Sequence, residues 1–330
     1  MLHLLVLNDN VIRTCNKHFE KVFEYLLKMP NFVSIGFSKI EKLTEAETSA
    51  LFMELFKKIP DNIIIYDRLL EINNINIPAQ CKISLIIDDI HHQGRSKIER
   101  VNNLKKVSNI FSTYGYCFKK YYKTDIPVYW FPHCAAYDIP FNKAPVSQVL
   151  LSGRLNKEIY PFRNTMWELS KTLPSLVYMP VNCGYRIPGD SESLIYAHRY
   201  VAKLSQYLAC VTCDASTDRP YIVAKHFEIL SSGSLLLAGN FNTKRYFEKL
   251  GFIDGIHYIA ITPENITEKI DYAMDPTNRA IIDKIRKAGY DKVRAYHFYA
   301  NRAYFLKRAL EDSGGFITYA DGIANTKYLL

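Results

Sequence analysis

The sequence predicts an α/β protein with two Rossmann-like, doubly wound domains that face each other across a central cleft. Strand-like and helix-like hydrophobic periodicities alternate along the whole chain, which is typical of parallel sheets covered by helices. The length of 330 residues is enough for two domains with cores of their own. A stretch with two prolines and little periodicity, 138–145, separates halves of similar layout, so we expect domains at 1–143 and 144–330.

The first half contains six apolar segments of strand length. They predict strands at about 2–7, 32–37, 62–66, 82–87, 109–113 and 127–131, with helices between them. One helix has a clear start, because Thr44 and Glu47 form the pattern of a capping box. Leu51, Phe52, Leu55, Phe56 and Ile59 then follow at helical spacing.

The second half repeats the alternation. We expect strands at about 148–152, 175–179, 208–212, 234–238 and 257–261, and helices that start near Pro161, Ser191, Tyr221, Thr243 and Pro263. Apolar spacing predicts helix from Thr277 to Glu311, which can pack back on the first domain, and Gly289 is expected to bend or split it. Ligands of doubly wound sheets bind beyond the carboxyl ends of the strands, so function is sought in the loops that follow strands.

Composition excludes several classes of protein. No apolar run reaches the roughly 18 residues of a membrane span, and the seven scattered cysteines form no disulfide framework, so we expect a cytoplasmic protein. The net charge of +9 is spread without a basic run, which fits an anionic small ligand or a membrane surface better than nucleic acid. Cys210 and Cys213 have metal or redox spacing but no partner pair, and are expected to be buried strand residues.

The segment 225–237 is the most informative part of the chain. It places Glu228 in an otherwise apolar helical stretch, followed by a Ser-Ser-Gly-Ser turn and a buried strand. A carboxylate can accept hydrogen bonds from both hydroxyls of a ribose, and a glycine turn lets the backbone approach a ligand. The alternative is a surface acid paired with Lys225, three residues earlier on the same helical face. The pattern alone does not separate these interpretations.

The segment Lys-x-Phe-Glu-Ile-x-x-Ser-Gly-x-Leu-Leu-Leu resembles the donor site of group 1 glycosyltransferases, particularly the branch related to bacterial spore-maturation glycosyltransferases. The resemblance extends to 151–154 with 160–163, to 251–259, and to Tyr296-His297 with Asn301-Arg302-Ala303. It covers about residues 148–310. The N-terminal half is similar only in layout.

The resemblance implies a GT-B fold and metal-independent transfer of a sugar from a nucleotide-sugar donor, UDP- or GDP-linked, to a hydroxyl of a glycan or glycoconjugate. Apart from this co-substrate it implies no cofactor, and the group's usual outcome is retention of the anomeric configuration. Glu228 would bind the ribose. Arg154 and Lys225 would face the diphosphate and act in catalysis, because fixed cations stabilise the charge of the leaving group. The further donor contacts that the resemblance implies are Gly153, Arg163, Arg219, Ser232, Gly233 and Ser234.

Two departures from the group's pattern leave the sugar and the stereochemistry open. Pro220 occupies the position of a second glutamate, eight residues before Glu228, so the usual acidic contact to the sugar is either missing or comes from Asp214 or Asp218. The usual arginine and lysine pair after the first strand of the C-terminal domain is half present. Lys157 lies closer to Arg154 than in the group, and Tyr160 takes the usual lysine position.

Acid and imidazole groups follow the predicted strand at 82–87. Asp88, Asp89, His91 and His92 should open onto the cleft, where Asp89, His91 or His92 could take a proton from the acceptor hydroxyl or hold the sugar. Loop capping by Asp88 and a surface histidine pair are the alternative. His133 follows the predicted strand at 127–131 and is either functional or a packing residue. We expect no metal, because adjacent aspartates differ from the Asp-x-Asp of metal-dependent glycosyltransferases.

Other function classes remain open on the sequence. Two α/β domains around a cleft also occur in non-catalytic proteins that bind sugars or nucleotides. A sugar-nucleotide epimerase or hydrolase could use the same scaffold. Nucleic-acid binding is suggested only by the net charge, and the absence of a basic cluster argues against it.

Overall fold

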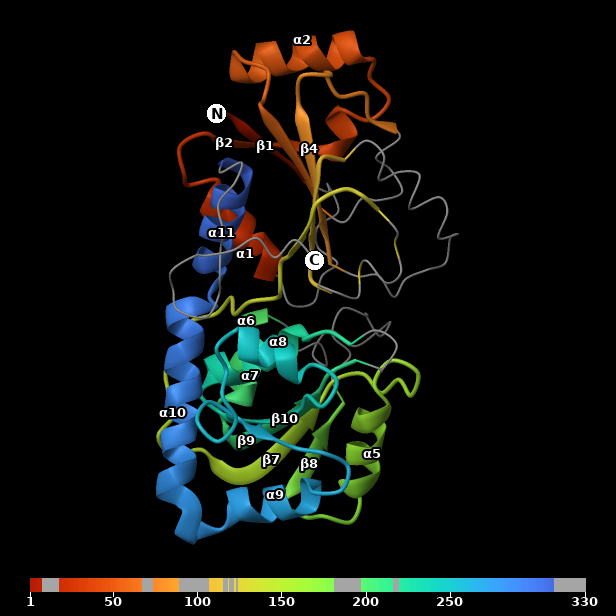
Figure 1. Ribbon diagram of the computed structural model, residues 1–330. Coiled ribbons are helices and arrows are strands. Elements are labelled where there is room, and N and C mark those ends of the chain that lie inside the picture. The colour runs from red at the N-terminus through yellow and green to blue at the C-terminus, as the bar shows by residue number, and fades with distance from the viewer. Residues whose placement is uncertain are drawn as a thin grey trace, which may run out of the picture.

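A computed structural model describes most of the chain. The described residues are 1–7, 18–66, 74–88, 107–114, 118, 122, 124–180, 197–215 and 220–311. They form two parallel sheets, each with helices beside it, stacked one above the other (Figure 1). The predicted α/β class with two doubly wound sheets is confirmed. Among the described helices, none is both long and apolar enough to cross a membrane.

The N-terminal sheet has the strand order β2-β1-β3-β4-β5-β6. Its strands are β1 (His3–Leu7), β2 (Phe32–Gly36), β3 (Asn62–Tyr66), β4 (Lys82–Ile87), β5 (Asn109–Ser112) and β6 (Val128–Trp130). Leu4 of β1 pairs with Val33 on one side and Ile63 on the other. The central strands read as unbroken apolar runs because both faces of a parallel sheet are covered.

The helices of this domain are α1 (His18–Leu26), the short 3-10 helix η2 (Phe37–Lys39) and α2 (Glu45–Phe56). The capping box of α2 is confirmed. The Thr44 hydroxyl accepts from the backbone N–H of Glu47 at 3.2 Å, and the Glu47 carboxylate accepts from the backbone N–H of Thr44 at 2.8 Å. Two N–H groups that the first helical turn would leave unpaired are thereby satisfied.

The C-terminal sheet has the order β11-β10-β9-β7-β8. Its strands are β7 (Val146–Ser152), β8 (Leu176–Met179), β9 (Tyr207–Cys213), β10 (Leu235–Gly239) and β11 (Ile259–Ala260). Around it lie α5 (Pro161–Leu169), α6 (Ala197–Leu204), α7 (Ala224–Ser232), α8 (Lys244–Lys249) and α9 (Ile266–Met274). Cys210 and Cys213 are buried in β9, as expected for strand residues.

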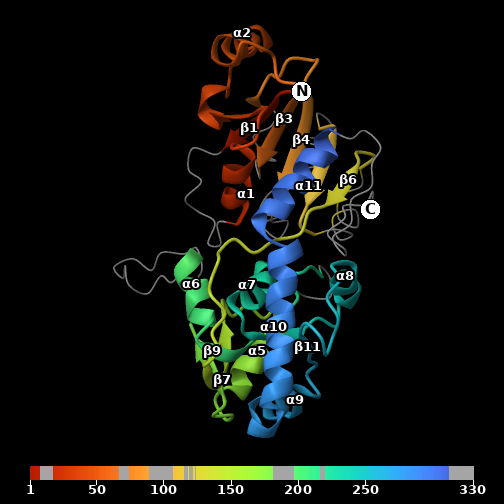
Figure 2. The same ribbon diagram turned by 90° about the vertical axis from the view of Figure 1, so that its left-hand side faces the viewer.

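The last described elements are the short 3-10 helix η4 (Pro276–Asn278) and the helices α10 (Arg279–Tyr296) and α11 (Tyr299–Glu311). Helix α10 runs along the C-terminal domain, and α11 lies beside α1 of the N-terminal domain (Figure 2). The ring of Tyr304 on α11 lies 5.7 Å from that of Tyr25 on α1. The two helices part at His297 and Phe298, where Ala135 exchanges backbone hydrogen bonds with His297 and Tyr299, both 2.9 Å long.

The expectation that Gly289 bends or splits the last helix is wrong. Gly289 lies inside the continuous helix α10. A Cβ at this position would lie 2.4 Å from the carbonyl oxygen of His257. Glycine is therefore required for close packing of α10 on the loop before β11, and the break falls eight residues later.

The linker between the two sheets, residues 138–145, contacts α10 through side-chain hydrogen bonds and an ion pair. Asp138 forms an ion pair of 2.5 Å with Arg294, and the carbonyl of Ile139 accepts from the Tyr290 hydroxyl at 2.9 Å. The buried guanidinium of Arg286 donates to the carbonyl of Asn142 at 2.8 Å and to that of Gly233 at 2.9 Å. One helix thus connects the linker to the C-terminal domain.

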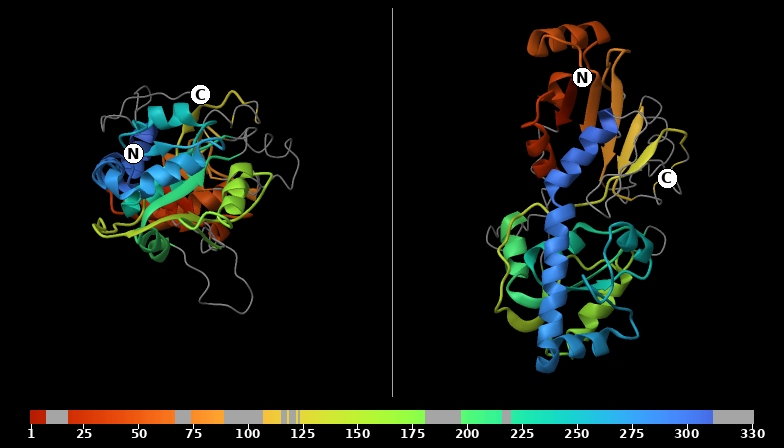
Figure 3. Two further views of the ribbon diagram at one scale, coloured as in Figure 1. Left: turned by 90° about the horizontal axis from the view of Figure 1, so that it is seen from below. Right: turned by 60° about the vertical axis from the view of Figure 1, so that its left-hand side comes forward.

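Side chains at the carboxyl ends of both sheets meet at the domain junction. Figure 3 shows the arrangement of the two sheets in two further views. Tyr114 follows β5, and its ring lies 4.2 Å from that of Tyr221, which precedes α7. Trp130 ends β6, and its ring lies 5.2 Å from that of Tyr246 on α8. The loops that follow strands in the two domains therefore face each other, as ligand sites in doubly wound proteins require.

Candidate functional site

Two buried cations converge on the loop that follows β7. Gly153 adopts φ +111°, a conformation that side chains rarely allow. A Cβ on Gly153 would lie 3.1 Å from Nζ of Lys225 and 3.5 Å from Nη1 of Arg163. Lys225 is 9% exposed and Arg163 is 3% exposed. The structure therefore brings three of the predicted donor residues together at the carboxyl end of the C-terminal sheet.

Arg163 belongs to the first turn of α5, which begins at Pro161 as predicted. Its Nη1 donates to the carbonyl of Arg154 at 3.0 Å, and its guanidinium lies 3.9 Å from the centre of the Tyr160 ring. In the described part of the chain, Nε of Arg163 is buried without a hydrogen-bond partner. A buried donor without a partner is costly, so this atom is suited to an anion that enters the site.

Lys225 is the second residue of α7 and lies near the positive end of the helix dipole. Its ammonium donates to the hydroxyl of Tyr200 at 2.5 Å and to that of Ser152 at 3.5 Å. Ser152 and Tyr200 are themselves 2.7 Å apart. Tyr200, on α6, was not a predicted site residue, because nothing in its local sequence marks it.

Arg154 lies next to these residues but has a different setting. Its side chain is exposed at the surface, while its backbone carbonyl holds Arg163. Lys157 is also exposed, and Tyr160 packs under Arg163. Arg163 thus supplies the second buried cation that the half-present arginine and lysine pattern seemed to lack.

Glu228 lies one helical turn after Lys225, on the same face of α7, and is only 7% exposed. The interpretation of Glu228 as an exposed surface acid is therefore wrong. Burial, with smaller contributions from the charges of Glu20 and Glu228, raises the pKa of Tyr137 to about 12. Tyr137 follows β6 and precedes the linker, so Glu228 is close to the domain junction.

Ser232, Gly233 and Ser234 lie at the opposite end of α7. At 1.5 Å per residue, this end is about 12 Å from the first residue of the helix. Gly233 ends α7 with φ +80°, where a Cβ would lie 2.8 Å from Phe141 of the linker. The Ser234 hydroxyl donates to the carbonyl of Leu204 at 2.7 Å. The structure does not bring these three residues together with Gly153 and Lys225.

Asp214 directly follows β9 and is 3% exposed. One carboxylate oxygen accepts from the backbone N–H of Asn242 at 2.9 Å, and burial raises the pKa of Asp214 to about 7 in spite of such hydrogen bonds. The side chain is therefore engaged with the loop before α8. The alternative candidate, Asp218, lies outside the described residues, as do Arg219, Asp89, His91 and His92.

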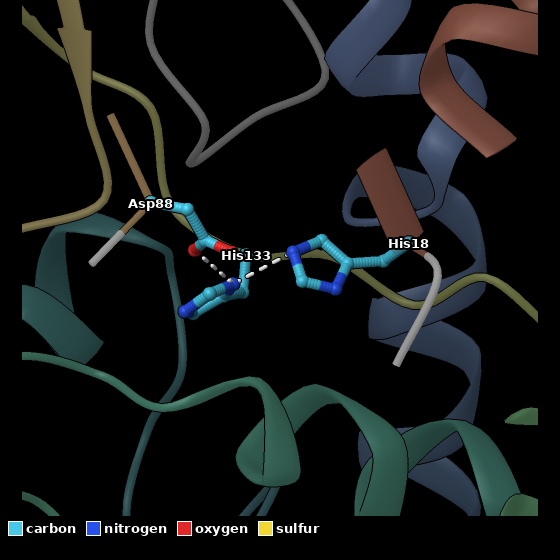
Figure 4. A group of neighbouring side chains, drawn as sticks. All are labelled: His18, Asp88 and His133. Atoms are coloured by element: carbon cyan, nitrogen blue, oxygen red, sulfur yellow. Dashed lines mark hydrogen bonds and ion pairs between the residues drawn. The ribbon is translucent and has the colours of Figure 1, made fainter. Parts of the chain in front are cut away.

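Asp88 and His133 meet at the junction together with His18, which the sequence did not single out (Figure 4). We call these three residues the acid-histidine cluster. Nδ1 of His133 lies 2.7 Å from Nε2 of His18 and 3.7 Å from a carboxylate oxygen of Asp88. Asp88 follows β4, His133 follows β6, and His18 begins α1. Only the fold brings such distant positions together.

The acid-histidine cluster has three atoms that could bind a metal ion, all within 4.8 Å of one another. The separation of 2.7 Å between the two histidine nitrogens nevertheless fits a hydrogen bond. Two nitrogens that bind one tetrahedral ion at its usual distances lie about 3.3 Å apart. The geometry therefore favours a hydrogen-bonded cluster over a set of metal ligands.

His226 lies near the buried cations Lys225 and Arg163 and near the acid-histidine cluster. Its Nδ1 is 3.1 Å from the carbonyl of Val223, which places the proton on this atom. Burial, with smaller contributions from the charges of Arg163, His133 and Lys225, lowers the pKa of His226 to about 3. His226 is therefore a neutral residue beside both groups.

A cavity of about 600 Å³ lies elsewhere, beside the start of α2 in the N-terminal domain. It is lined by Thr44, Glu45, Ile75, Asn76, Ile77, Pro78, Ala79, Cys81 and Ile83. Among its described lining residues the one carboxylate, that of Glu45, accepts from the backbone N–H of Ala79 at 2.9 Å. Converging charges mark the domain junction, and not this cavity, as the candidate site.

Comparison with known proteins shows a similarity to glycosyltransferases in part of the chain. Residues 181–308 match a family model described as "Glycosyl transferase-like". This stretch contains Lys225, Glu228 and Arg302, so the resemblance to glycosyltransferases is confirmed, without specific support for the spore-maturation branch. No curated protein matches the chain by sequence.

Solved structures show the same architecture at low identity. HepE from Anabaena, solved with UDP-glucose, is 10% identical with a TM-score of 0.64, over 94% of this chain and 100% of HepE. TarM is 10% identical with a TM-score of 0.53, over 78% of this chain and 57% of TarM. The O-GlcNAc transferase of Thermobaculum terrenum is 11% identical with a TM-score of 0.57, over 93% of this chain and 66% of the transferase. The fold of this chain is GT-B.

Proposed function

We propose that this chain, a GT-B protein with a glycosyltransferase-like C-terminal half, transfers a sugar from a nucleotide-sugar donor to a hydroxyl of a glycan or glycoconjugate. The observation that carries the proposal is the convergence of Lys225 and Arg163 on Gly153. A diphosphate offers the negative charges and acceptor oxygens that two buried cations need. The amino end of α7, which is the positive end of its dipole, adds to the positive electrostatic potential of these two cations.

The nucleoside is assigned to α7. Glu228 lies one turn beyond Lys225, so a diphosphate held at Lys225 places the ribose within reach of a buried carboxylate. The two ribose hydroxyls can donate to the two oxygens of that carboxylate. The complex of HepE with UDP-glucose supports a UDP-sugar as donor, and a GDP-sugar fits the same phosphate and ribose contacts.

Transfer then requires stabilisation of the leaving nucleoside diphosphate, whose charge increases as its bond to the sugar breaks. Lys225 and Arg163 are positioned before the reaction begins, so they stabilise this charge without reorganisation. The proposed reaction is therefore independent of a divalent metal. Arg154 is assigned a smaller role than Arg163, because its side chain is exposed.

The proposal is tested by titrating the protein with UDP-glucose or GDP-mannose and measuring binding by calorimetry and the change in Tm by thermal shift. We expect one of them to raise Tm, because a ligand that binds only the folded state stabilises it. Glu228→Gln should lower the affinity for the nucleotide sugar at least tenfold and leave the affinity for inorganic diphosphate unchanged. Lys225→Met should lower the affinity for both ligands. Glu168→Gln, at an exposed acid of α5, is the matched control. Equal affinities in wild type and Glu228→Gln would disprove the ribose contact.

A further inference from the structure

The two helices that carry the buried cations begin at residues that pack against the N-terminal domain. Arg163 is in the first turn of α5, which follows Tyr160, and Lys225 is in the first turn of α7, which follows Val223. One apolar core, built mainly by the N-terminal sheet, reaches both of these starting points. Its members at the junction are Tyr114, Ala215, Tyr221 and Val223, with Ile159 and Tyr160 packed against it. The N-terminal domain therefore contacts the segments from which both cations project.

Three tyrosines form a continuous series of contacts from the N-terminal domain to Arg163. The ring of Tyr114, which follows β5, lies 4.2 Å from that of Tyr221. The hydroxyl of Tyr221 lies 3.3 Å from that of Tyr160. The guanidinium of Arg163 lies over the ring of Tyr160, 3.9 Å from its centre. We call Tyr114, Tyr221 and Tyr160 the tyrosine chain.

Tyr160 contacts Arg163 through its backbone as well as through its ring. Its carbonyl accepts from the backbone N–H of Arg163 at 3.1 Å, where α5 begins. A guanidinium is planar, so the ring of Tyr160 on one side and the carbonyl of Arg154, 3.0 Å from Nη1, together restrict its orientation. A shift of Tyr160 would therefore change the direction in which Arg163 donates its hydrogen bonds.

The other end of the tyrosine chain is attached to the N-terminal sheet. Tyr114 is 1% exposed, and its backbone N–H donates to the hydroxyl of Ser112, the last residue of β5, at 3.2 Å. The indole of Trp130, which ends β6, donates to the carbonyl of Thr113 at 3.3 Å. Two neighbouring strands thus fix the segment that carries Tyr114.

We propose that Tyr160 is a positioning residue for Arg163, and that Tyr221 and Tyr114 make this position depend on the N-terminal domain. The inference rests on the proposed function, because it takes Arg163 as a contact of the donor diphosphate. Tyr114 is two side chains removed from Arg163 along the tyrosine chain and belongs to the other domain, yet it controls the affinity for a diphosphate. Such coupling is reciprocal, so a bound diphosphate also stabilises the contact between the domains.

Calorimetric titration with inorganic diphosphate, UDP and GDP tests the coupling. Tyr114→Leu removes the ring contact with Tyr221 and should lower the affinity about five- to tenfold, the size of effect expected when a guanidinium loses its place over a ring. Tyr114→Phe keeps the ring and should bind within twofold of wild type. Phe52→Leu is the matched control, because Phe52 is a fully buried ring of the same apolar core on α2. The control should lower Tm and keep the wild-type affinity within twofold.

A double-mutant cycle separates coupling from a general loss of structure. Tyr160→Leu should also lower the affinity about five- to tenfold, and Tyr114→Leu should lower it less than twofold further in that background. If Tyr114→Leu does not fold, Tyr221→Phe takes its place in the cycle. This variant keeps both rings, removes the hydroxyl contact with Tyr160, and should lower the affinity about two- to fivefold.

Several results would overturn the tyrosine chain and leave the donor site in place. They are wild-type affinity in Tyr114→Leu and Tyr221→Phe, an equal loss of affinity in Phe52→Leu, and losses from Tyr114→Leu and Tyr160→Leu that multiply in the double variant. A folded wild type that binds neither a diphosphate nor any nucleotide sugar would instead overturn the proposed function, and this inference with it.

Discussion

Gly153 and Lys225 lie so close together that a side chain on Gly153 would press on the ammonium end of the lysine. A Cβ on Gly153 would lie 3.1 Å from Nζ and 3.2 Å from Cε of Lys225. The loop after β7 and the first turn of α7 thus form one surface. This contact places a cation next to the backbone at the carboxyl end of a sheet, which is where a diphosphate is proposed to bind.

Gly153→Ala should therefore weaken donor binding as well as stability. The residue has φ +111°, so a side chain strains the backbone and also presses on Lys225. We expect a loss of about 1–3 kcal/mol in the free energy of unfolding and at least a tenfold loss of diphosphate affinity. Urea denaturation and calorimetric titration measure these two quantities.

Gly255→Ala is the matched control for Gly153→Ala. Gly255 has φ +75°, but a Cβ there meets no atom within 4 Å. The control should lose about 1–2 kcal/mol from backbone strain and bind inorganic diphosphate as the wild type does. If both variants bound diphosphate equally well, contact with Lys225 would have no role in the site.

Lys225→Met should remove a cation that stabilises the leaving group while preserving the apolar stem of the side chain. We expect kcat for nucleotide-sugar cleavage to fall about 100- to 1000-fold, as found when one preorganised electrostatic contact is removed. Lys171→Met replaces an exposed lysine paired with Glu168 and should change kcat less than twofold. Steady-state kinetics on both variants, with Tm as a check of folding, distinguishes lost catalysis from lost structure.

Arg286→Met should destabilise the protein far more than Arg279→Met, although both arginines pair with Asp283. The side chain of Arg286 is buried and also satisfies the carbonyls of Gly233 and Asn142, whereas that of Arg279 is 32% exposed. One buried and one partly buried carbonyl without partners predict a loss of about 2–5 kcal/mol for Arg286→Met, against less than about 1 kcal/mol for the control. Equal losses in urea denaturation would show that the linker contact is not stabilising.

Asp214 should make stability depend on pH. Burial raises the pKa of Asp214 from 3.8 to about 7, so the folded state binds more protons between these values. Stability contributed by Asp214 therefore falls as the pH rises from about 4 to about 7. Asp214→Asn remains neutral and keeps an oxygen that can accept from Asn242.

As the pH rises, the free energy of unfolding of the wild type should therefore fall relative to that of Asp214→Asn. The expected change is at most about 1.4 kcal/mol per pH unit. Urea denaturation at pH 4.5, 6 and 7.5 measures it. A difference that stays constant with pH would mean that Asp214 keeps an ordinary pKa in the folded protein.

The strands could be predicted from the sequence because buried parallel strands are short apolar runs bounded by polar loops. β4 and β10 show this most clearly. The role of Gly289 was wrongly predicted because a glycine in a helix can either bend the helix or allow a neighbouring segment to pack closely. Only the position of His257 shows that Gly289 serves close packing. A helix break at His297 depends instead on backbone pairing with Ala135, which is a tertiary contact.

The candidate site was predictable only where its residues are neighbours in sequence. Lys225 and Glu228 share one helix face, so their spacing marked them. Arg163 was one of several candidates, and the structure distinguishes it by burial and by its distance from Gly153. His18 could not be linked to Asp88 and His133 without the fold, since the three come from separate elements.

Release of nucleoside diphosphate from nucleotide sugars by wild type and Lys225→Met is the most direct test of the proposed glycosyltransferase activity. The account predicts that wild type releases UDP or GDP from a matching donor and forms a new glycoside when an acceptor is present. Lys225→Met should release it at least 100-fold more slowly. Equal rates in the two proteins, or no release from any donor by a folded wild type, would contradict the account.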